Sequence, residues 1–485
     1  MVAKSLMFQG TGSDVGKSIL VAGLCRAYTR RGLKVLPFKP QNMSNNAAVT
    51  PCGGEIGRAQ HLQALAAHAE PTVHMNPVLL KPESDTGAQV VVHGKRYDRA
   101  EAGSYQTMKK HLLGAVMESF TKLKREADLV LIEGAGSPAE VNLRANDIAN
   151  MGFALPTNTP VVLIGDINRG GVIAAVTGTH KLLPPEEQAL IKGTIINLFR
   201  GDVSLFDGGL VRMEEETGWP NFGVVPFLRC VGDLPPEDAV VLEKSAYSKK
   251  EKFRVAVPML PRIANFDDID PLKNEENIEV VFCRPGTPMP RDADLIIIPG
   301  SKATIADLRF MKSEGWDIDI LAHARAGGAV LGICGGYQML GDVVADPRGI
   351  EGQVTHENGL GLLPVSTLLA EEKQTRVCEA KVMGLDVSIT GYEIHAGESD
   401  AGGEFEPFMT VGNELIGLKA KGAPVWGTYL HGLFESGAFR KSFFGGIGAE
   451  ISGADFGPKV EAALDALADA LEEHLDLDAM LLHAQ

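Results

Sequence analysis

Short apolar runs of four to seven residues, rich in Val, Ile and Leu, recur along this 485-residue sequence and end in Gly or Asp. Segments with helical periodicity separate these runs. A strand that is apolar on both faces needs cover on both faces, which a parallel sheet between two layers of helices provides. The pattern therefore predicts an α/β fold. No run approaches the roughly 18 apolar residues of a membrane-spanning helix, and residues 1–10 do not resemble an export signal.

The runs form two series, and each series predicts one doubly wound α/β domain. The first predicts strands at residues 5–9, 34–39, 129–133, 161–166, 193–198 and near Val224. The second predicts strands at residues 254–258, 278–282, 293–299, 329–333 and 425–429. A polar stretch with paired prolines separates them, as in an exposed connection. We therefore expect domains over 1–232 and 253–450, a linker over 233–252 and a C-terminal helical tail over 451–485.

The net charge indicates which partners the protein can bind, and the cysteine content indicates its redox compartment. With 62 acidic and 46 basic side chains the formal charge is −16, which repels nucleic acid and anionic membranes. We expect neither as a partner. The six cysteines contain no CxxC pair, so neither a disulfide framework nor a zinc ribbon is indicated. Reduced thiols in a cytoplasmic protein are the simplest interpretation, and the sequence makes no prediction of oligomeric state.

A glycine-rich loop, GTGSDVGKS at residues 10–18, joins the first predicted strand to a helix at 17–31. Backbone N–H groups around Gly12 and Gly16 can surround a phosphate, Lys17 can contact the terminal phosphates of ATP, and Ser18 can ligate Mg²⁺. The loop is one residue longer than a strict Walker A motif. The structural alternative is a tight glycine turn with an exposed lysine, but the strand and helix context favours a phosphate-binding loop.

Acidic and amide side chains supply candidates for the rest of this site. Glu133 ends a buried strand just before Gly134, so we interpret it as a Mg²⁺ ligand, with a solvent-facing carboxylate as the alternative. Glu55, in a glycine-rich segment, is a second candidate ligand or a solvated loop acid. Asn197 closes another predicted strand and is a candidate to contact adenine or to cap the strand.

The second domain contains a thiol in a strand-to-helix turn. Cys334 follows the apolar run at 329–333, with Gly332 and Gly336 on either side. This Gly-x-Cys-x-Gly pattern is typical of a nucleophile elbow, whereas a buried inert cysteine is the alternative. A nucleophilic thiol needs a base. His431, just past the strand at 425–429, is our candidate, and His395 is its main rival.

Backbone donors for an oxyanion hole are expected next to the thiol. The loop that follows the predicted strand at 293–299 begins at Gly300, and Gly335 directly follows the nucleophile. Their N–H groups could stabilise the negative charge of a tetrahedral intermediate.

These motifs carry a family resemblance. The second domain resembles class I glutamine amidotransferases and the first resembles dethiobiotin synthetase. Across nearly the whole chain, the two together resemble the cobyric acid synthase family of cobalamin biosynthesis. The most specific stretches are FKPQNMSNNA at 38–47, MNPVLLKPES at 75–84, GDINRGG at 165–171 and YLHG at 429–432.

The resemblance implies ATP- and glutamine-dependent amidation of four carboxylates, b, d, e and g, of a corrinoid, adenosylcobyrinic acid a,c-diamide. Cys334 would form a glutamyl thioester and His431 would act as general base and acid. Lys17, Lys39 and Mg²⁺ would neutralise charge during phosphoryl transfer from ATP. Class I amidotransferases usually place a Glu two residues after the His, where this chain has Leu433. Either Glu435 takes that place or the site is a dyad.

Three alternatives stay open. Cobyrinic acid a,c-diamide synthase shares both domains, but the stretch at 38–47 argues against it. A partitioning-type ATPase has no use for the cysteine elbow and His431. A cysteine hydrolase with a structural nucleotide-binding domain predicts amide hydrolysis that is independent of ATP and Mg²⁺.

Overall fold

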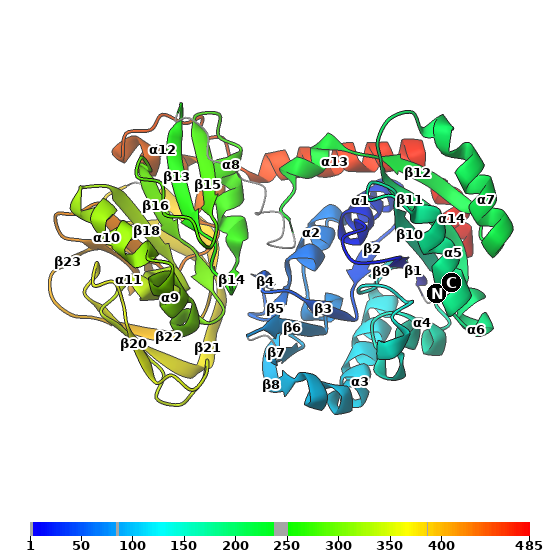
Figure 1. The fold of residues 1–485 in the computed structure, drawn as a ribbon, viewed down its shortest axis with the longest axis horizontal. Coiled ribbons are helices and arrows are strands. Elements are labelled where there is room, and N and C mark those ends of the chain that lie inside the picture. The colour runs from blue at the N-terminus through cyan, green and yellow to red at the C-terminus, as the bar shows by residue number, and fades with distance from the viewer. Residues whose placement is uncertain (1–2, 84–86, 237–250, 386) are drawn as a thin grey trace.

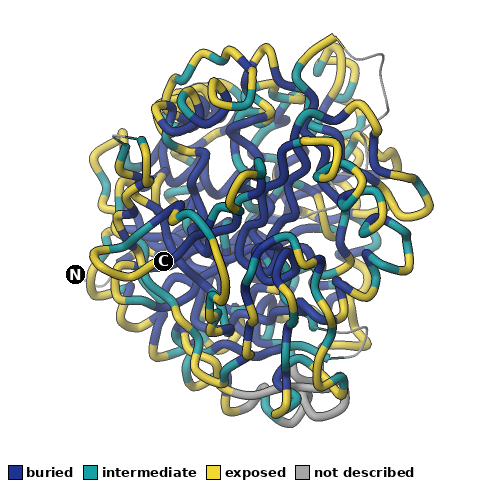
Figure 2. Tube along the Cα trace, turned by 90° about the vertical axis from the view of Figure 1, so that its left-hand side faces the viewer, coloured by how far each residue is buried: buried dark blue, intermediate teal, exposed yellow. Residues whose placement is uncertain are grey.

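The computed structural model describes residues 3–83, 87–236, 251–385 and 387–485. These residues form two lobes (Figure 1), an N-terminal lobe from residues 3–236 and a C-terminal lobe from residues 251–456. Viewed along the long axis of the molecule, buried residues gather in the centre and exposed residues lie at the periphery (Figure 2). One large hydrophobic cluster fills the C-terminal lobe and two lie on the sheet of the N-terminal lobe, in agreement with the two predicted α/β folds.

The N-terminal lobe is built on a six-stranded parallel sheet with the order β12-β11-β10-β1-β9-β2. Every strand predicted for this part of the chain is present. The strands are β1 (Lys4–Gly10), β2 (Val35–Phe38), β9 (Leu129–Glu133), β10 (Val161–Asp166), β11 (Ile191–Phe199) and β12 (Asn221–Pro226). Since β1 lies at the centre, the phosphate-binding loop that follows it emerges from the middle of the sheet.

Helices cover both faces of this sheet because neighbouring residues of its strands point to opposite sides. Leu6 and Phe8 of β1 pack in one core cluster, whereas Met7 packs in the other. The helices of this lobe are α1 (Lys17–Arg30), α2 (Arg58–Ala66), α3 (Ala102–Glu126), α4 (Met151–Thr157), α5 (Val172–Leu182), α6 (Pro185–Gln188) and α7 (Asp207–Thr217).

Short strands lie where the two lobes meet (Figure 1). They form a small sheet of order β3-β6-β7-β8 and a separate antiparallel pair, β4 and β5. Their bounds are β3 (Gln41–Met43), β4 (Ala47–Val49), β5 (Glu55–Gly57), β6 (Val78–Pro82), β7 (Gly87–Val92) and β8 (Lys95–Glu101). Sequence periodicity did not predict these strands. They contain parts of the stretches at 38–47 and 75–84 that carry the family resemblance, so both stretches lie near the boundary between the lobes.

The C-terminal lobe has an eleven-stranded sheet, larger than the predicted parallel one. Its five predicted strands form a parallel part in the order β15-β13-β16-β18-β25. A mostly antiparallel extension continues from β25, with one parallel pairing between β19 and β21. The parallel strands are β13 (Phe253–Pro258), β15 (Ile278–Cys283), β16 (Leu295–Ile298), β18 (Ala329–Ile333) and β25 (Val425–Thr428). The extension contains β19 (Val343–Ala345), β20 (His356–Asn358), β21 (Val365–Val382), β22 (Val387–Ala401), β23 (Phe405–Val411) and β24 (Glu414–Ala420).

Two further strands and five helices complete this lobe. The strands β14 (Ile263–Ala264) and β17 (Gly300–Ser301) form an antiparallel pair beside the sheet. The helices are α8 (Asp270–Lys273), α9 (Thr304–Ser313), α10 (Trp316–Arg325), α11 (Gly335–Leu340) and α12 (Gly437–Gly446).

The C-terminal tail returns to the N-terminal lobe, where the predicted helix is two helices, α13 (Gly457–His474) and α14 (Leu477–His483). The helix breaks at Leu475, whose extended backbone pairs with Gly223, and Asp476 caps the next helix. Leu467 of α13 packs against α1 at Gly23, where a Cβ would lie 2.7 Å from the leucine. This close approach explains the glycine.

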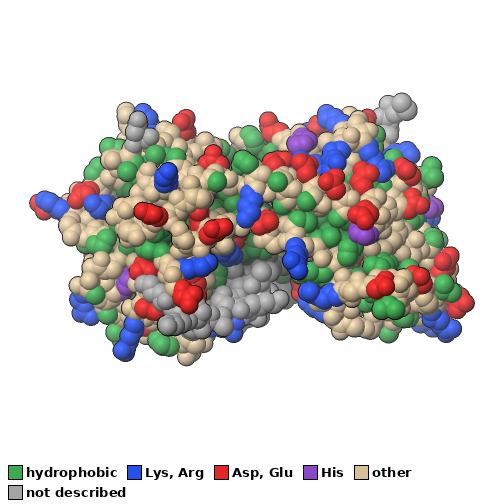
Figure 3. Space-filling model, turned by 90° about the horizontal axis from the view of Figure 1, so that it is seen from above, with side chains coloured by type: hydrophobic (Ala, Val, Ile, Leu, Met, Phe, Trp, Pro, Cys, Tyr) green, Lys and Arg blue, Asp and Glu red, His purple; other side chains and the backbone are tan. Residues whose placement is uncertain are grey.

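The described residues form no helix that is both long and apolar enough to cross a bilayer. On the upper face of the molecule, acidic and basic side chains are interspersed (Figure 3). Residues 237–250 of the expected linker lie outside the described residues, so the domain boundary stays a prediction.

Candidate active sites

The loop between β1 and α1 leaves open space for a ligand. A Cβ at Gly12 would meet no atom within 4 Å, and Gly16 adopts a left-handed conformation with φ of 88°. The Lys17 ammonium donates to the carbonyl oxygens of Gly12 (3.0 Å) and Gly136 (3.3 Å), so it lies over the loop. This geometry suits a bound phosphate, in agreement with the phosphate-binding interpretation and not with an exposed lysine.

Glu133 is the centre of a buried polar cluster beside this loop. One of its carboxylate oxygens accepts hydrogen bonds from Ser18 Oγ (2.7 Å) and Lys39 Nζ (2.8 Å). The other accepts from the amides of Gln63 (2.7 Å) and Gln60 (3.3 Å). The carboxylate is 1% exposed, and the lysine compensates its charge.

The chemistry of this cluster fits Mg²⁺. Ser18 and Glu133 place a hydroxyl and a carboxylate oxygen side by side next to the phosphate-binding loop. Mg²⁺ prefers oxygen ligands and commonly takes one or two from protein and the others from phosphate and water. Within the described part of the chain, no three His, Cys, Asp or Glu side chains converge on a common metal position.

Glu55 differs from the sequence expectation of a metal ligand. Its two oxygens pair with Lys81 (2.8 Å) and with Lys373 of β21 (2.6 Å), so an ammonium occupies each one. Burial raises the pKa of Glu55, but the two lysines outweigh it and lower that pKa to about 2. The side chain therefore acts in an ion-pair cluster that joins the lobes.

Asn197 lies beneath the phosphate-binding loop. Its amide nitrogen donates to the Val15 carbonyl (2.9 Å), and a Cβ at Gly16 would lie 2.3 Å from that nitrogen. The side chain therefore holds the loop backbone, a role that the strand-end position alone did not predict.

Cys334 lies in the turn between β18 and α11 with φ of 52° and ψ of −110°. Such a backbone is strained for a non-glycine residue and is found at functional turns. Gly332 and Gly336 are required because a Cβ at either would lie 2.5 Å or less from backbone oxygen. The thiol lies 3.6 Å from the Ile394 carbonyl oxygen. The predicted elbow geometry is thus present.

His431 is held by a carboxylate from a distant part of the chain. Its Nδ1 lies 2.7 Å from Asp268 Oδ2, and the other carboxylate oxygen of Asp268 accepts from the Gly432 N–H at 2.7 Å. The ring also stacks on Tyr392, with 5.1 Å between centroids. Asp268 is in η6 (Phe266–Ile269), and the pattern of the sequence did not single it out. Its only local signal is an adjacent pair of aspartates in a turn.

This carboxylate sets the charge state of the imidazole. Burial opposes the charged form, but Asp268, with a smaller contribution from Cys334, outweighs it and raises the pKa of His431 to about 10. Among the described residues, His431 Nε2 is buried without a hydrogen-bond partner. One ring nitrogen is therefore fixed, and the other remains for proton transfer.

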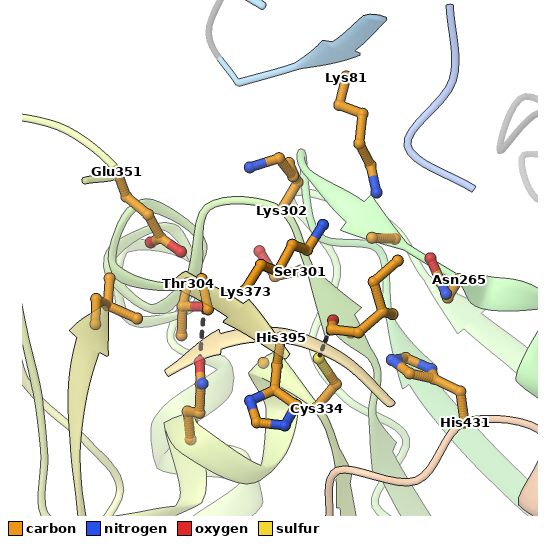
Figure 4. Close-up of a pocket in the computed structure, with 17 residues that line it drawn as sticks. Lys81, Asn265, Ser301, Lys302, Thr304, Cys334, Glu351, Lys373, His395 and His431 are labelled. Carbon is orange, nitrogen blue, oxygen red and sulfur yellow. Dashed lines mark hydrogen bonds between the residues drawn. The ribbon is translucent and has the colours of Figure 1, made fainter. Parts of the chain in front are cut away.

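One pocket brings these groups together (Figure 4). It is lined by Cys334, His431, His395, Gly300 and Gly335, as expected for a thiol, a base and two backbone donors. Lys81 of the N-terminal lobe also lines it, as do Lys302 and Lys373.

His395, the rival base, is held differently. Its Nδ1 lies 2.8 Å from the Gly397 carbonyl oxygen, and its ring stacks on Tyr429 with 3.7 Å between centroids. Glu393 Oε1 lies 3.7 Å from its Nε2, beyond hydrogen-bond distance. This arrangement favours His431 as the base. Glu435 contacts Arg58 at 3.4 Å, whereas Asp268 occupies the third position beside His431.

Two family models match consecutive parts of the chain. Residues 6–241 match a CobQ/CobB/MinD/ParA nucleotide binding domain, and residues 254–439 match a CobB/CobQ-like glutamine amidotransferase domain. Curated relatives named cobyric acid synthase from Brucella suis and Mesorhizobium japonicum are 55% identical over 479 and 486 residues. A relative of that name from Brucella anthropi is 54% identical over 479 residues. Each match covers 99% of this chain and 99% of the relative. The chain belongs to the cobyric acid synthase family.

Proposed function

We propose that this chain is a glutamine-hydrolysing, ATP-dependent amidoligase that amidates the b, d, e and g carboxylates of adenosylcobyrinic acid a,c-diamide to give adenosylcobyric acid. The observation that carries the proposal is its match, at 55% identity over 99% of both chains, to a relative named cobyric acid synthase. The thiol site and the phosphate-binding site described above support it. We further propose a cytoplasmic location, which the six unpaired cysteines support.

In the C-terminal lobe, the Cys334 thiol first gives its proton to His431, in line with the raised pKa of that imidazole. The resulting thiolate then attacks the carboxamide carbon of glutamine. The Gly300 and Gly335 N–H groups stabilise the oxyanion. When the carbon–nitrogen bond breaks, His431 returns the proton to the leaving nitrogen, which departs as ammonia and leaves a glutamyl thioester. Water, deprotonated by His431, then hydrolyses the thioester to glutamate and restores the thiol. Asp268 holds the imidazole and stabilises its charged form at each transfer.

In the N-terminal lobe, the loop at residues 10–18 surrounds the phosphates of ATP, and Lys17 moves from its carbonyl partners to the γ-phosphate. The corrinoid carboxylate attacks the γ-phosphorus, ADP departs, and an acyl phosphate forms. Ammonia then displaces phosphate to give the amide. Ser18 and Glu133 would hold Mg²⁺, which would supply positive charge against the phosphate oxygens. Lys39, 2.8 Å from Glu133, adds a second fixed cation.

Mass spectrometry with amide-¹⁵N-labelled glutamine tests this function. With ATP, Mg²⁺ and adenosylcobyrinic acid a,c-diamide, we expect a product that carries four ¹⁵N amides. Two amides added to cobyrinic acid instead would identify cobyrinic acid a,c-diamide synthase. Glutamine hydrolysis that is indifferent to ATP, with no change in the corrinoid, would identify a cysteine hydrolase.

A further inference from the structure

The turn that carries Asp268 is held by the other lobe. Arg58 is the first residue of α2, directly after β5, and its backbone N–H donates to the Asn46 carbonyl at 3.2 Å. Its guanidinium extends from the N-terminal lobe and lies 2.9 Å from Asp267 Oδ2. Both side chains are largely buried, with 11% of Arg58 and 4% of Asp267 exposed. The pair is a desolvated contact between the lobes.

The charges around this contact show that Arg58 compensates a buried carboxylate next to Asp268. Asp267 and Asp268 are adjacent, buried carboxylates, and His431 is the only cation that contacts either of them from the C-terminal lobe among the described side-chain pairs. Burial raises the pKa of Asp267, Arg58 opposes this effect, and Asp268 adds to it. Without Arg58, two carboxylates would share one imidazole, and like charges this close cannot both stay ionised in a buried site.

A second contact from the same lobe fixes the same turn. The Asn265 amide donates to the Ala47 carbonyl of β4 (3.1 Å) and to the Tyr392 hydroxyl (2.8 Å), and Tyr392 stacks on His431. Asn265 has φ of 53°, so the turn begins in a strained conformation that the contacts maintain. Residues of the N-terminal lobe therefore contact the neighbours of the base: Arg58 pairs with Asp267 beside Asp268, and Ala47 holds the Asn265 amide that donates to Tyr392.

We propose that Arg58 is a positioning residue for glutamine hydrolysis, which neutralises Asp267 so that Asp268 remains an ionised partner that orients His431. This proposal rests on the function proposed above. It makes the thiol site dependent on a cation of the nucleotide-binding lobe. Arg58 does not line the pocket with Cys334, so its loss should reduce kcat for glutamine and leave KM little changed.

Kinetics of four variants of the full chain test the proposal. We expect Arg58→Met to lower kcat for glutamine hydrolysis by about 10²-fold, the scale of a misoriented catalytic group, while amidation with free ammonia is unchanged. Asp267→Asn in the Arg58→Met background should recover most of that loss, because the uncompensated carboxylate is gone. Arg58→Lys should retain more activity than Arg58→Met. Glu435→Gln, which removes the second and more exposed partner of Arg58, is the matched control and should be active.

In a further variant, Arg58→Ala, the small side chain leaves space for an exogenous ion, and added guanidinium should restore hydrolysis, which a purely structural defect would not allow. The proposal is overturned if Arg58→Met keeps its kcat, if the double variant is no better than the single one, or if amidation with ammonia is lost together with hydrolysis. A wild-type protein that hydrolyses no glutamine would instead overturn the proposed function.

Discussion

The Lys373 ammonium lies 2.6 Å from Glu55 Oε1, and this ion pair joins β21 of the C-terminal lobe to β5 of the N-terminal lobe. The second oxygen of Glu55 pairs with Lys81 at 2.8 Å. Lys81 and Lys373 both line the pocket that contains Cys334. One buried carboxylate therefore faces two lysines at the edge of the thiol site, and burial outweighs the pull of Glu55 and lowers the pKa of Lys373 to about 7.

This arrangement predicts an order of stabilities. Glu55→Gln leaves two buried lysines without a counter-charge and should lower the free energy of unfolding by about 3–5 kcal/mol. Lys373→Met should cost less, because Glu55 keeps Lys81. Urea unfolding curves of both variants at neutral pH check the order. An equal or greater loss in Lys373→Met would contradict it.

Substitutions in the thiol site and in the phosphate-binding site should have different effects on amidation. Cys334→Ala removes the nucleophile and should abolish glutamine-dependent amidation, yet keep amidation with free ammonia. Lys17→Ala removes the cation that we propose contacts the phosphates of ATP and should abolish amidation with either nitrogen donor. Assays of corrinoid amidation with glutamine or with ammonium salt distinguish the variants. A fully active Cys334→Ala protein with glutamine would show that this thiol is not the nucleophile.

Glu133→Gln should impair amidation in the N-terminal lobe and leave glutamine hydrolysis in the C-terminal lobe intact. The amide keeps the shape of the side chain but leaves Lys39 without its carboxylate and removes the charged oxygen next to Ser18. We expect ATP-dependent amidation to fall at least about 10²-fold with either donor, as when a charge-stabilising group is lost. Glutamine hydrolysis should persist and serves as the control for folding. Normal amidation would exclude Glu133 from the metal site.

The ion pair between His431 and Asp268 predicts a pH dependence of stability. Because the folded-state pKa of His431 is raised from 6.5 to about 10, its contribution is fully present below pH 6.5 and is lost as pH rises through 10. Asp268→Asn removes the largest cause that raises this pKa, so the pKa of His431 falls while the smaller contribution of Cys334 stays. The difference in unfolding free energy between wild type and variant should shrink between those pH values. Unfolding curves across this range measure it, and the same substitution in a His431→Gln background should show no such trend.

Features with local sequence signals were predicted well. The parallel strands of both lobes follow from short apolar runs. The loop at residues 10–18 and the elbow at Cys334 follow from glycines and a reactive side chain within a few positions. These requirements are local because a strand-to-helix turn is made by consecutive residues. Of the strands between the lobes, β3, β4 and β5 were missed because they have three residues each and show no period.

Partners that depend on the tertiary fold were not predicted. Asp268 and His431 are 163 residues apart, and Glu55 and Lys373 are 318 residues apart. No spacing rule connects such pairs, and Glu55 in a glycine-rich segment gave the pattern of a loop acid or metal ligand. The carboxylates were visible in the sequence, whereas their cationic partners became evident only from the packing of one lobe against the other.

The docking of the C-terminal tail gives the last prediction. Leu467 is fully buried against α1, which begins at Lys17, whereas Leu482 of α14 is 82% exposed. Leu467→Ala should lower the free energy of unfolding by about 2–5 kcal/mol through lost burial and a residual cavity. Leu482→Ala is the matched control and should have no measurable effect. Since the tail packs on the N-terminal lobe, Leu467→Ala should reduce ATP binding when heated before it affects glutamine hydrolysis. Equal stability of the two variants would contradict the docking.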